Sequence, residues 1–247
     1  MATPAEKLVQ SLEHLHKLQA ADGAAAIRAR DLPRTHRERL VSSGFLQEVI
    51  KGWYIPSHPD EAKAESTVWY ASFWRFCAAY LEERFRTECC LSPEQSLSLH
   101  AGNWTVPWQL MVRSPGARNK VTKLPHGTSL LDVRAALPKA ADREAKEGLR
   151  LFSAESALIK CSPHYFSNHP TDVRTVLSMV RDGSRLLALL LEGGHTVIAG
   201  RLAGAFRNIG RDRIADEIVR TMSAARYDVR ESDPFADKLT LRPSYGM

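Results

Sequence analysis

The chain has 247 residues, of which 44% are hydrophobic and 25% are charged, and its formal net charge is +6. This length is enough for one large domain or two small ones, and the apolar fraction excludes wholesale disorder. The N-terminus has no apolar core of a secretion signal, and the longest apolar run, residues 186–191, is far shorter than the ~20 residues that span a bilayer. These features predict a soluble, cytoplasmic protein that has no contact with a membrane.

The cysteines argue against a metal site. They have no C-x-x-C spacing and no histidines at zinc-finger spacing, so we expect buried, reduced thiols. They are Cys77, Cys89, Cys90 and Cys161. The chain also lacks a G-x-S-x-G nucleophile motif. The sequence therefore predicts no metal, no cofactor and no enzymatic activity.

The first predicted element is a helix over residues 4–21. Leucines recur at spacings of four and three residues, which places them on one side of a helix. They are Leu8, Leu12, Leu15 and Leu18. Thr3 and Glu6 have the spacing of a capping box, in which each side chain accepts a hydrogen bond from the backbone N–H of the other residue. Gly23 is expected to end the helix.

Residues 24–44 have the order of a helix-turn-helix. We expect a short helix, a turn at Leu32-Pro33, and then a basic helix over residues 34–42 that Gly44 stops.

Two short strands are predicted next, around a tight turn at Lys51-Gly52, where glycine permits a sharp reversal of the chain. Such a hairpin after a helix-turn-helix is a wing. The order of the elements therefore predicts that residues 1–60 form a winged helix-turn-helix domain that binds DNA.

The predicted DNA contacts lie on the basic helix and on the hairpin turn. Six basic and three acidic residues between Arg28 and Lys51 give a local net charge of +3. Side chains near the start of a recognition helix reach base edges, and arginine suits guanine and phosphate. The candidate DNA-binding residues are Arg34, Thr35, His36, Arg37, Arg39 and Lys51. The alternative is a solvated helix with ion pairs such as Arg34–Glu38.

The sequence pattern of the remaining chain predicts a mixed domain over residues 61–229, with a small sheet and a helical C-terminal part. A buried helix is expected near residues 61–86, after which residues 91–112 alternate like strands and turns. Further strands are expected at residues 108–112, 122–124, 129–133 and 149–152, and an exposed connection at residues 138–148.

The C-terminal part has helical periodicity. The predicted helices span residues 154–159, 171–182, 184–191, 196–207 and 212–225. Residues 230–247 have turn formers and no periodicity, and we expect a mobile tail. The predicted fold class is α+β: an N-terminal winged helix-turn-helix, then the mixed domain.

A second basic cluster lies in the stretch GRLAGAFRNIGRDR. Its basic residues are Arg201, Arg207, Arg211 and Arg213. A solvated surface and a contact with DNA or an acidic partner are equally consistent with this composition. Gly200 and Gly204 form a G-x-x-x-G spacing, but that motif is informative only in an apolar membrane span, which this segment is not.

The stretch DLPRTHRERLVSSGFLQEVIKGWYIP resembles the N-terminal winged helix of AbiEi-type antitoxins. In that family a leucine, a glycine and a glycine-X-tyrosine wing recur in this order, matched here by Leu40, Gly44 and the GWY of residues 52–54. The later stretch LSPEQSLSLHAGNWTVPWQLMVRSP resembles the family's core, in which an apolar strand follows a serine-rich helix start. Residues 152–225 resemble its helical C-terminal part, so the resemblance covers most of the chain with short motifs.

The same blocks are similar to the regulatory region that precedes Fic domains in some bacterial proteins. Fic enzymes transfer AMP through an H-P-F-x-x-G-N-G-R motif. That motif is absent here, because His169-Pro170 is followed by Thr171-Asp172. The resemblance thus predicts a regulator, either standalone or the front piece of a longer protein, without Fic catalysis.

The resemblance to AbiEi-type proteins implies a bacterial, antitoxin-like transcription factor that represses its own toxin–antitoxin operon. The expected partners are double-stranded operator DNA and a cognate toxin, and a homodimer would suit palindromic operators. The alternative function is a protein-interaction module that restrains a toxin or a Fic-type enzyme.

Overall fold

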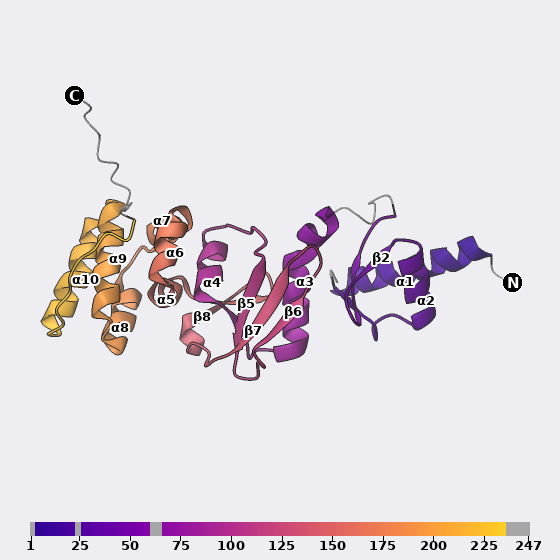
Figure 1. Ribbon diagram of the computed structural model, residues 1–247, viewed down its shortest axis with the longest axis horizontal. Coiled ribbons are helices and arrows are strands. Elements are labelled where there is room, and N and C mark those ends of the chain that lie inside the picture. Colours follow the sequence, from indigo (N-terminus) through magenta and orange to yellow (C-terminus); the bar gives the residue numbers. More distant parts are fainter. Residues whose placement is uncertain (1–2, 23–25, 60–65, 236–247) are drawn as a thin grey trace, which may run out of the picture. The chain divides into compact units, whose positions relative to one another are not determined.

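The computed structural model of the chain describes residues 3–22, 26–59 and 66–235. Within these ranges it is an α+β protein with ten α-helices and with sheets of three, four and two strands (Figure 1). The chain divides into two compact units. The first unit contains residues 1–91, 105–137 and 145–150, and the second contains residues 92–104, 138–144 and 151–247. The expected domain boundary at residue 60 stays a prediction.

Helix α1 (Pro4–Asp22) begins where the sequence predicts. The capping box is formed: the backbone N–H of Thr3 donates to Glu6 Oε2 at 2.8 Å, and the backbone N–H of Glu6 donates to Thr3 Oγ1 at 3.2 Å. These bonds satisfy two N–H groups that a helix start leaves without intrahelical partners. The predicted stop at Gly23 lies outside the described residues.

The prediction of a short helix before the basic helix is wrong for the part of that stretch that the structure describes. Strand β1 (Ile27–Arg28) stands there, paired antiparallel with Tyr54 and Trp53. A tight turn follows, in which the backbone N–H of Asp31 donates to the Arg28 carbonyl at 3.0 Å. The reason is that pairing with a distant strand leaves only a few residues before Pro33, whose ring disfavours a helical residue in front of it.

The basic helix and the hairpin are confirmed. Helix α2 spans Arg34–Ser42, and strands β2 (Leu46–Ile50) and β3 (Trp53–Pro56) form an antiparallel pair. Between them Gly52 has a φ of +83°, which a residue with a Cβ adopts only at a cost. The strand order is β1-β3-β2.

Side chains from α1, α2 and this sheet share one hydrophobic core. Its buried members are Leu15, Ile27, Leu32, Leu40, Leu46 and Tyr54. The leucine stripe predicted for α1 supplies partly buried neighbours of this cluster, namely Leu8, Leu12 and Leu18. The core therefore fixes α2 and the hairpin against α1.

The first unit also contains helix α3 (Thr67–Phe85) and a four-stranded sheet (Figure 1). The strands are β4 (Cys90–Leu91), β5 (Gln109–Ser114), β6 (Lys120–Lys123) and β7 (Ser129–Arg134), in the order β4-β5-β7-β6. Strands β5 and β7 are parallel, and the other pairs are antiparallel. The indole N–H of the buried Trp69 donates to Thr128 Oγ1 at 3.1 Å, which ties the start of α3 to the start of β7.

The prediction of strands and turns over residues 91–112 is wrong for the first part of this stretch. Helix α4 (Pro93–His100) occupies it, with Ser92 as its N-cap and proline in its first turn. Ser92 Oγ accepts a hydrogen bond from the backbone N–H of Gln95 at 3.2 Å. The cap and the proline are start signals that outweigh the alternation of polar and apolar residues.

The second unit is mostly helical. Its helices after α4 are α5 (Ala154–Lys160), α6 (Pro163–Asn168), α7 (Pro170–Met179), α8 (Ser184–Gly193), α9 (Thr196–Asn208) and α10 (Asp212–Ala224). Helix α6 is not among the helices predicted from the sequence. Pro163 and Pro170 stand in the first turns of α6 and α7, where proline is well tolerated. The expected connection at residues 138–148 contains a 3-10 turn (Ala140–Asp142) and strand β8 (Arg143–Lys146), which pairs with β9 (Leu149–Phe152). Among the described residues, no helix combines the length and the apolar character that crossing a bilayer requires.

The chain after α10 packs against α9, so the expected mobile tail does not begin at residue 230. The backbone N–H of Ser232 donates to the carbonyl of Gly200 at 3.2 Å, and Phe235 is only 9% exposed. A Cβ placed on Gly200 would lie 1.9 Å from the Arg230 carbonyl oxygen, and one on Gly204 would lie 2.1 Å from that of Ser232. The G-x-x-x-G spacing thus lets the main chain lie directly on a helix.

We expect Gly200→Ala to destabilise the protein by about 1–3 kcal/mol, because the new methyl group would displace the segment that carries Arg230. Alanine normally stabilises a helix interior relative to glycine by about 1 kcal/mol, so a loss of stability would report the clash itself. The measurement is urea unfolding followed by circular dichroism. The control is Gly116→Ala, whose Cβ would meet Ser114 Oγ at an ordinary 3.8 Å. Equal or higher stability of Gly200→Ala would contradict the packing.

Candidate nucleic-acid interface

Three of the six candidate DNA-binding side chains are exposed. Arg34 and Thr35 stand at the start of α2, and Lys51 stands at the hairpin turn. The Arg34 side chain is 80% exposed, and its Nε donates to Glu38 Oε1 at 2.6 Å. This pair raises the pKa of Arg34, mainly through the hydrogen bond. The ion pair expected as the alternative is therefore formed, but the guanidinium still faces solvent.

The other two candidate arginines point into the first unit, which corrects their assignment as DNA contacts. Arg37 Nη1 donates to the carbonyl of Ala29 at 2.6 Å, and the guanidinium lies 5.7 Å from the centre of the Tyr54 ring. Arg39 Nη1 donates to the carbonyl of Lys7 and to Ser11 Oγ, both at 2.7 Å. These hydrogen bonds join α2 to the turn after β1 and to α1.

His36 also faces α1. Its Nδ1 lies 2.9 Å from Ser11 Oγ, and its ring centre lies 4.3 Å from that of His14. Burial lowers the pKa of His36, and the nearby His14 and Arg39 lower it further. His36 is thus held as a neutral contact between two helices rather than presented to a phosphate.

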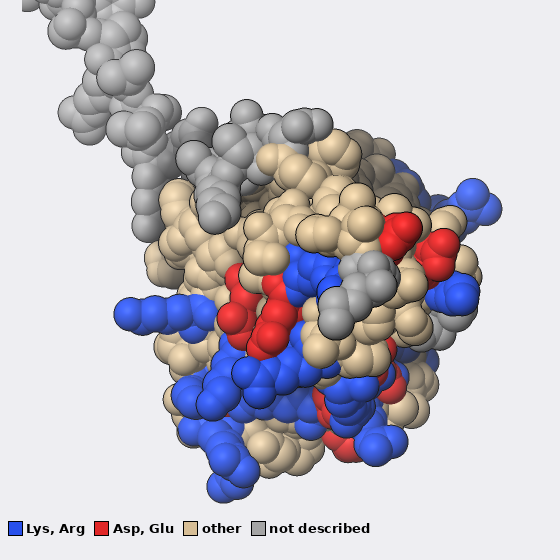
Figure 2. Space-filling view, turned by 90° about the vertical axis from the view of Figure 1, so that its right-hand side faces the viewer, with Lys and Arg blue, Asp and Glu red and all other residues tan. Residues whose placement is uncertain are grey.

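Helix α2 has no side-chain cap, because Pro33 precedes it and has no polar side chain. The N–H groups of the first turn are accordingly available beside Arg34 and Thr35, and a helix start of this kind favours an anion. Figure 2 looks at the side on which α1 and α2 lie in Figure 1. Lys and Arg side chains gather over part of this face, with Asp and Glu side chains beside them.

The second basic cluster does not form a basic surface. Arg201 is 7% exposed, its Nη2 donates to the Cys161 carbonyl at 3.3 Å, and its guanidinium lies 4.9 Å from the Phe166 ring centre. Burial lowers the pKa of Arg201, and its Nε has no partner in the described residues. It cannot meet DNA from this position.

Arg207 and Arg211 also bind groups of the second unit itself. Three carboxylates bind Arg207 within 3.2 Å, and its pKa is raised mainly by the hydrogen bond to Glu231. Arg211 donates to the carbonyls of Ser178 and Val180 at 3.0 and 2.6 Å, at the end of α7. Arg213 alone of the four remains largely exposed, with 72% of its side chain accessible.

The cysteine prediction is confirmed: all four thiols are free and buried. No group of three or more His, Cys, Asp or Glu side chains in the described ranges is arranged to hold a metal ion. A second polar cluster of the second unit joins Ser98 of α4 to Asp172 of α7. Ser98 Oγ lies 2.5 Å from the Tyr165 hydroxyl and 3.2 Å from Asp172 Oδ2, and Asn103 Nδ2 donates to the same Asp172 oxygen at 2.9 Å. No histidine accepts the Ser98 proton in this cluster, so it has the features of a structural network between helices.

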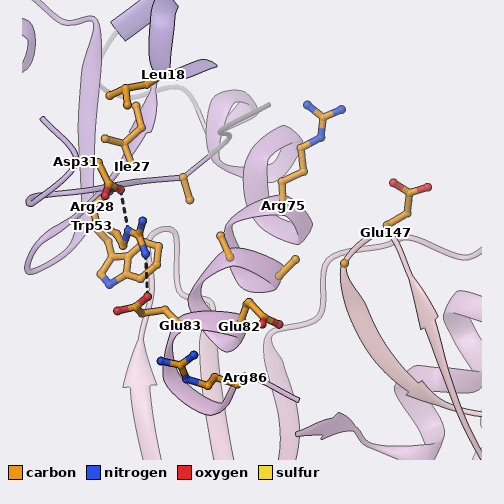
Figure 3. A pocket seen from close by; sticks show the side chains of 14 residues that line it. Leu18, Ile27, Arg28, Asp31, Trp53, Arg75, Glu82, Glu83, Arg86 and Glu147 are labelled. Atoms are coloured by element: carbon orange, nitrogen blue, oxygen red, sulfur yellow. Dashed lines mark hydrogen bonds and ion pairs between the residues drawn. The ribbon is translucent and has the colours of Figure 1, made fainter. Parts of the chain in front are cut away.

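A cavity of about 740 Å³ in the first unit is lined by charged residues of both signs (Figure 3). Arg28 crosses it and donates to Asp31 at 2.7 Å and to Glu83 at 2.8 Å. Arg75 and Arg86 line the same cavity together with further carboxylates, so the lining favours neither anions nor cations.

Sequence reasoning missed a more basic segment. Residues 105–137 contain five Arg or Lys residues and one carboxylate, Asp132. Asp132 is fully buried: Oδ1 accepts the backbone N–H groups of Arg118 and Lys120 at 2.8 and 3.0 Å, and Oδ2 accepts Arg84. Burial opposes ionisation, but these donors outweigh it and lower the pKa of Asp132. A charge count over the whole of residues 105–137, connections included, would have found this segment.

No family model and no curated protein matches the chain. Among solved structures, the crystal structure of the RV2827C protein from Mycobacterium tuberculosis is similar, with a TM-score of 0.51 and 14% sequence identity. The similarity covers 91% of this chain and 83% of that chain. At this identity the likeness concerns the fold alone, and it agrees with an α+β architecture.

We expect Arg39→Ala to lower the free energy of unfolding by about 1–2 kcal/mol, because it removes two hydrogen bonds that join α2 to α1. Arg34→Ala is the matched control, since it removes one solvent-exposed i,i+4 ion pair, which contributes little to stability. Urea unfolding of both variants measures the difference. Equal effects would show that the Arg39 contacts do not hold the helices together.

The His36 pKa also predicts a pH dependence of stability. A histidine whose folded pKa lies below its unfolded value of 6.5 binds fewer protons when folded. Its contribution is therefore complete above pH 6.5 and is lost as the pH falls toward the folded pKa. The urea midpoint should decrease from pH 7.5 to 5 more steeply in the wild type than in His36→Gln. Parallel profiles would contradict this assignment.

Proposed function

We propose that the first unit binds double-stranded DNA through the start of α2 and the β2–β3 turn. The observation that carries the proposal is the joint exposure of Arg34, Thr35 and Lys51 on two elements that one hydrophobic core holds together. The uncapped start of α2 adds backbone N–H groups suited to a phosphate. Arg34 supplies a planar pair of donors for a guanine edge or a phosphate.

The finer fold that we propose for residues 3–59 is a winged helix-turn-helix. The order α1-β1-α2-β2-β3 places a helix directly before an antiparallel hairpin, as a recognition helix precedes a wing. One turn between β1 and α2 replaces the usual middle helix. In this arrangement α2 would lie in the major groove, and Lys51 would meet the backbone beside it.

The biological role that we propose is autoregulation in an antitoxin-like system, in which occupation of a promoter blocks transcription. The support is the resemblance of DLPRTHRERLVSSGFLQEVIKGWYIP to AbiEi-type antitoxins together with the exposed residues of α2. Cytoplasmic location, a homodimer on a palindromic operator and a cognate toxin belong to the same proposal, as does the lack of catalytic activity.

The test is a mobility shift with the chain's own upstream DNA. Arg34→Glu combined with Lys51→Glu should abolish the shift, because it reverses both exposed charges near the proposed grooves. Arg37 and Arg39 are left intact, since their substitution would disturb the fold rather than a contact. The control pair is Lys160→Glu with Arg181→Glu, two exposed cations of the second unit. A full shift in the first double variant would refute the assigned DNA contacts.

A second candidate function, a protein-interaction module that restrains a toxin, is favoured by one observation. Trp108, Met111 and Val121 are large hydrophobic side chains that are 76%, 40% and 47% exposed on or next to β5 and β6. Met111 and Val121 both pair with Leu131 of β7, so they lie in one row across the sheet. A pull-down with the neighbouring gene product, using Met111→Ser/Val121→Ser as the negative variant, distinguishes this function from operator binding.

A further inference from the structure

The edge of the four-stranded sheet carries a set of cations without partners. In the part of the chain that the structure describes, strand β6 lies at the end of the sheet and pairs with β7 alone. Four exposed basic side chains lie on β6, on the connection before it and at the end of β7, and none of them has a hydrogen bond or an ion pair with the described residues. They are Arg118, Lys120, Lys123 and Arg134. This distinguishes them from the arginines of α2, most of which are paired.

The buried Asp132 explains why these cations are unpaired. It is the only carboxylate of residues 105–137, and it lies inside, bound to Arg84 and to the backbone of the β5–β6 connection. The negative charge of Asp132, which could neutralise part of the segment, is thus buried and does not lie at the surface. What remains outside is of one sign, which attracts polyanions.

The surface beside β6 is also hollowed. A cavity of about 700 Å³ is lined by Arg84, Arg118 and Lys120, with Thr122 and Ser114 as polar neighbours and Glu88 as its one carboxylate. Arg84 is held in place: Nη1 donates to the Tyr80 hydroxyl at 3.2 Å, and the guanidinium lies 4.8 Å from the Phe85 ring centre. Asp132 compensates the charge of Arg84, so the cations of the cavity that are left without a carboxylate partner in the described residues are Arg118 and Lys120.

Side chains alternate between the two faces along a strand, so Lys123 points to the other face of β6 from Lys120. Arg134 shares the face of Asp132 and Lys120, and its backbone N–H donates to Asn119 Oδ1 at 2.7 Å, next to Arg118. We infer that this β6 edge surface, defined by Arg118, Lys120 and Arg134 with the cavity beside them, binds the phosphate backbone of a nucleic acid. A phosphodiester fits because it offers repeated single charges at a spacing that separate lysines and arginines can follow. A second copy of the chain is a poor occupant, since like charges would face each other. The inference rests on the proposed function and adds a second contact region to it.

The experiment is fluorescence anisotropy of the full chain with duplex DNA of random sequence, titrated at several salt concentrations. Each lost phosphate contact should lower the slope of log Kobs against log salt by ~0.9. Arg118→Ala/Lys120→Ala/Arg134→Ala should therefore reduce the slope by roughly 2–3, and the swap Arg118→Lys/Lys120→Arg/Arg134→Lys should restore most of it. The control, which removes the same charge from the second unit, is Lys160→Ala/Arg181→Ala/Arg220→Ala.

The outcomes separate this inference from the proposed function. An unchanged slope in the β6 triple variant, with binding lost in the Arg34/Lys51 variant, overturns the inference alone. The reverse pattern overturns the α2 contacts and supports the β6 edge surface. An equal loss in the second-unit control shows a general charge effect and overturns the inference. Polyglutamate serves as an acidic protein probe: if it binds as tightly as the duplex and shows the same loss, the surface belongs to a protein partner. No binding of any nucleic acid overturns both proposals.

Discussion

The buried carboxylate of Asp132 joins three parts of the first unit that are distant in sequence. It receives Arg84 from α3 and two backbone N–H groups from the connection that leads into β6. A buried charge without such donors would cost several kcal/mol, so the three segments must stay together for the carboxylate to remain ionised. The same burial leaves residues 105–137 with basic but no acidic side chains at the surface. A requirement of folding thus determines the sign of a surface.

The N-terminal part of the first unit divides its cations differently. Arg37 and Arg39 act inside, where carbonyl oxygens of the β1 turn and of α1 accept their hydrogen bonds. Arg34 and Lys51 remain at the surface. All of these cations contribute to the electrostatic field of the region, because the acceptors of Arg37 and Arg39 are uncharged. Only the side chains at the surface can contact a polyanion directly.

The elements that were predicted correctly are those with local signals. The capping box of Thr3 and Glu6, the helix over residues 34–42 and the hairpin at Gly52 each depend on neighbouring residues. Strand β1 depends on pairing with β3, some 25 residues later, and no local pattern indicates it. The orientation of the Arg39 side chain could not be predicted from the sequence either, because its hydrogen-bond acceptors are a main-chain carbonyl and a serine of α1. Exposure of single side chains on a predicted helix could be anticipated, but their distant partners could not.

The two glycines of α9 extend the second unit beyond its last helix. Main chain near Ser232 replaces side chains as the layer that covers Gly200 and Gly204, and Phe235 closes the end of that layer against Phe166. A shortened protein that stops after α10 would lack this layer. The backbone of α9 at Gly200 and Gly204 would then be exposed to water. For crystallisation or binding assays, the last secondary-structure element is therefore the wrong place to cut this chain.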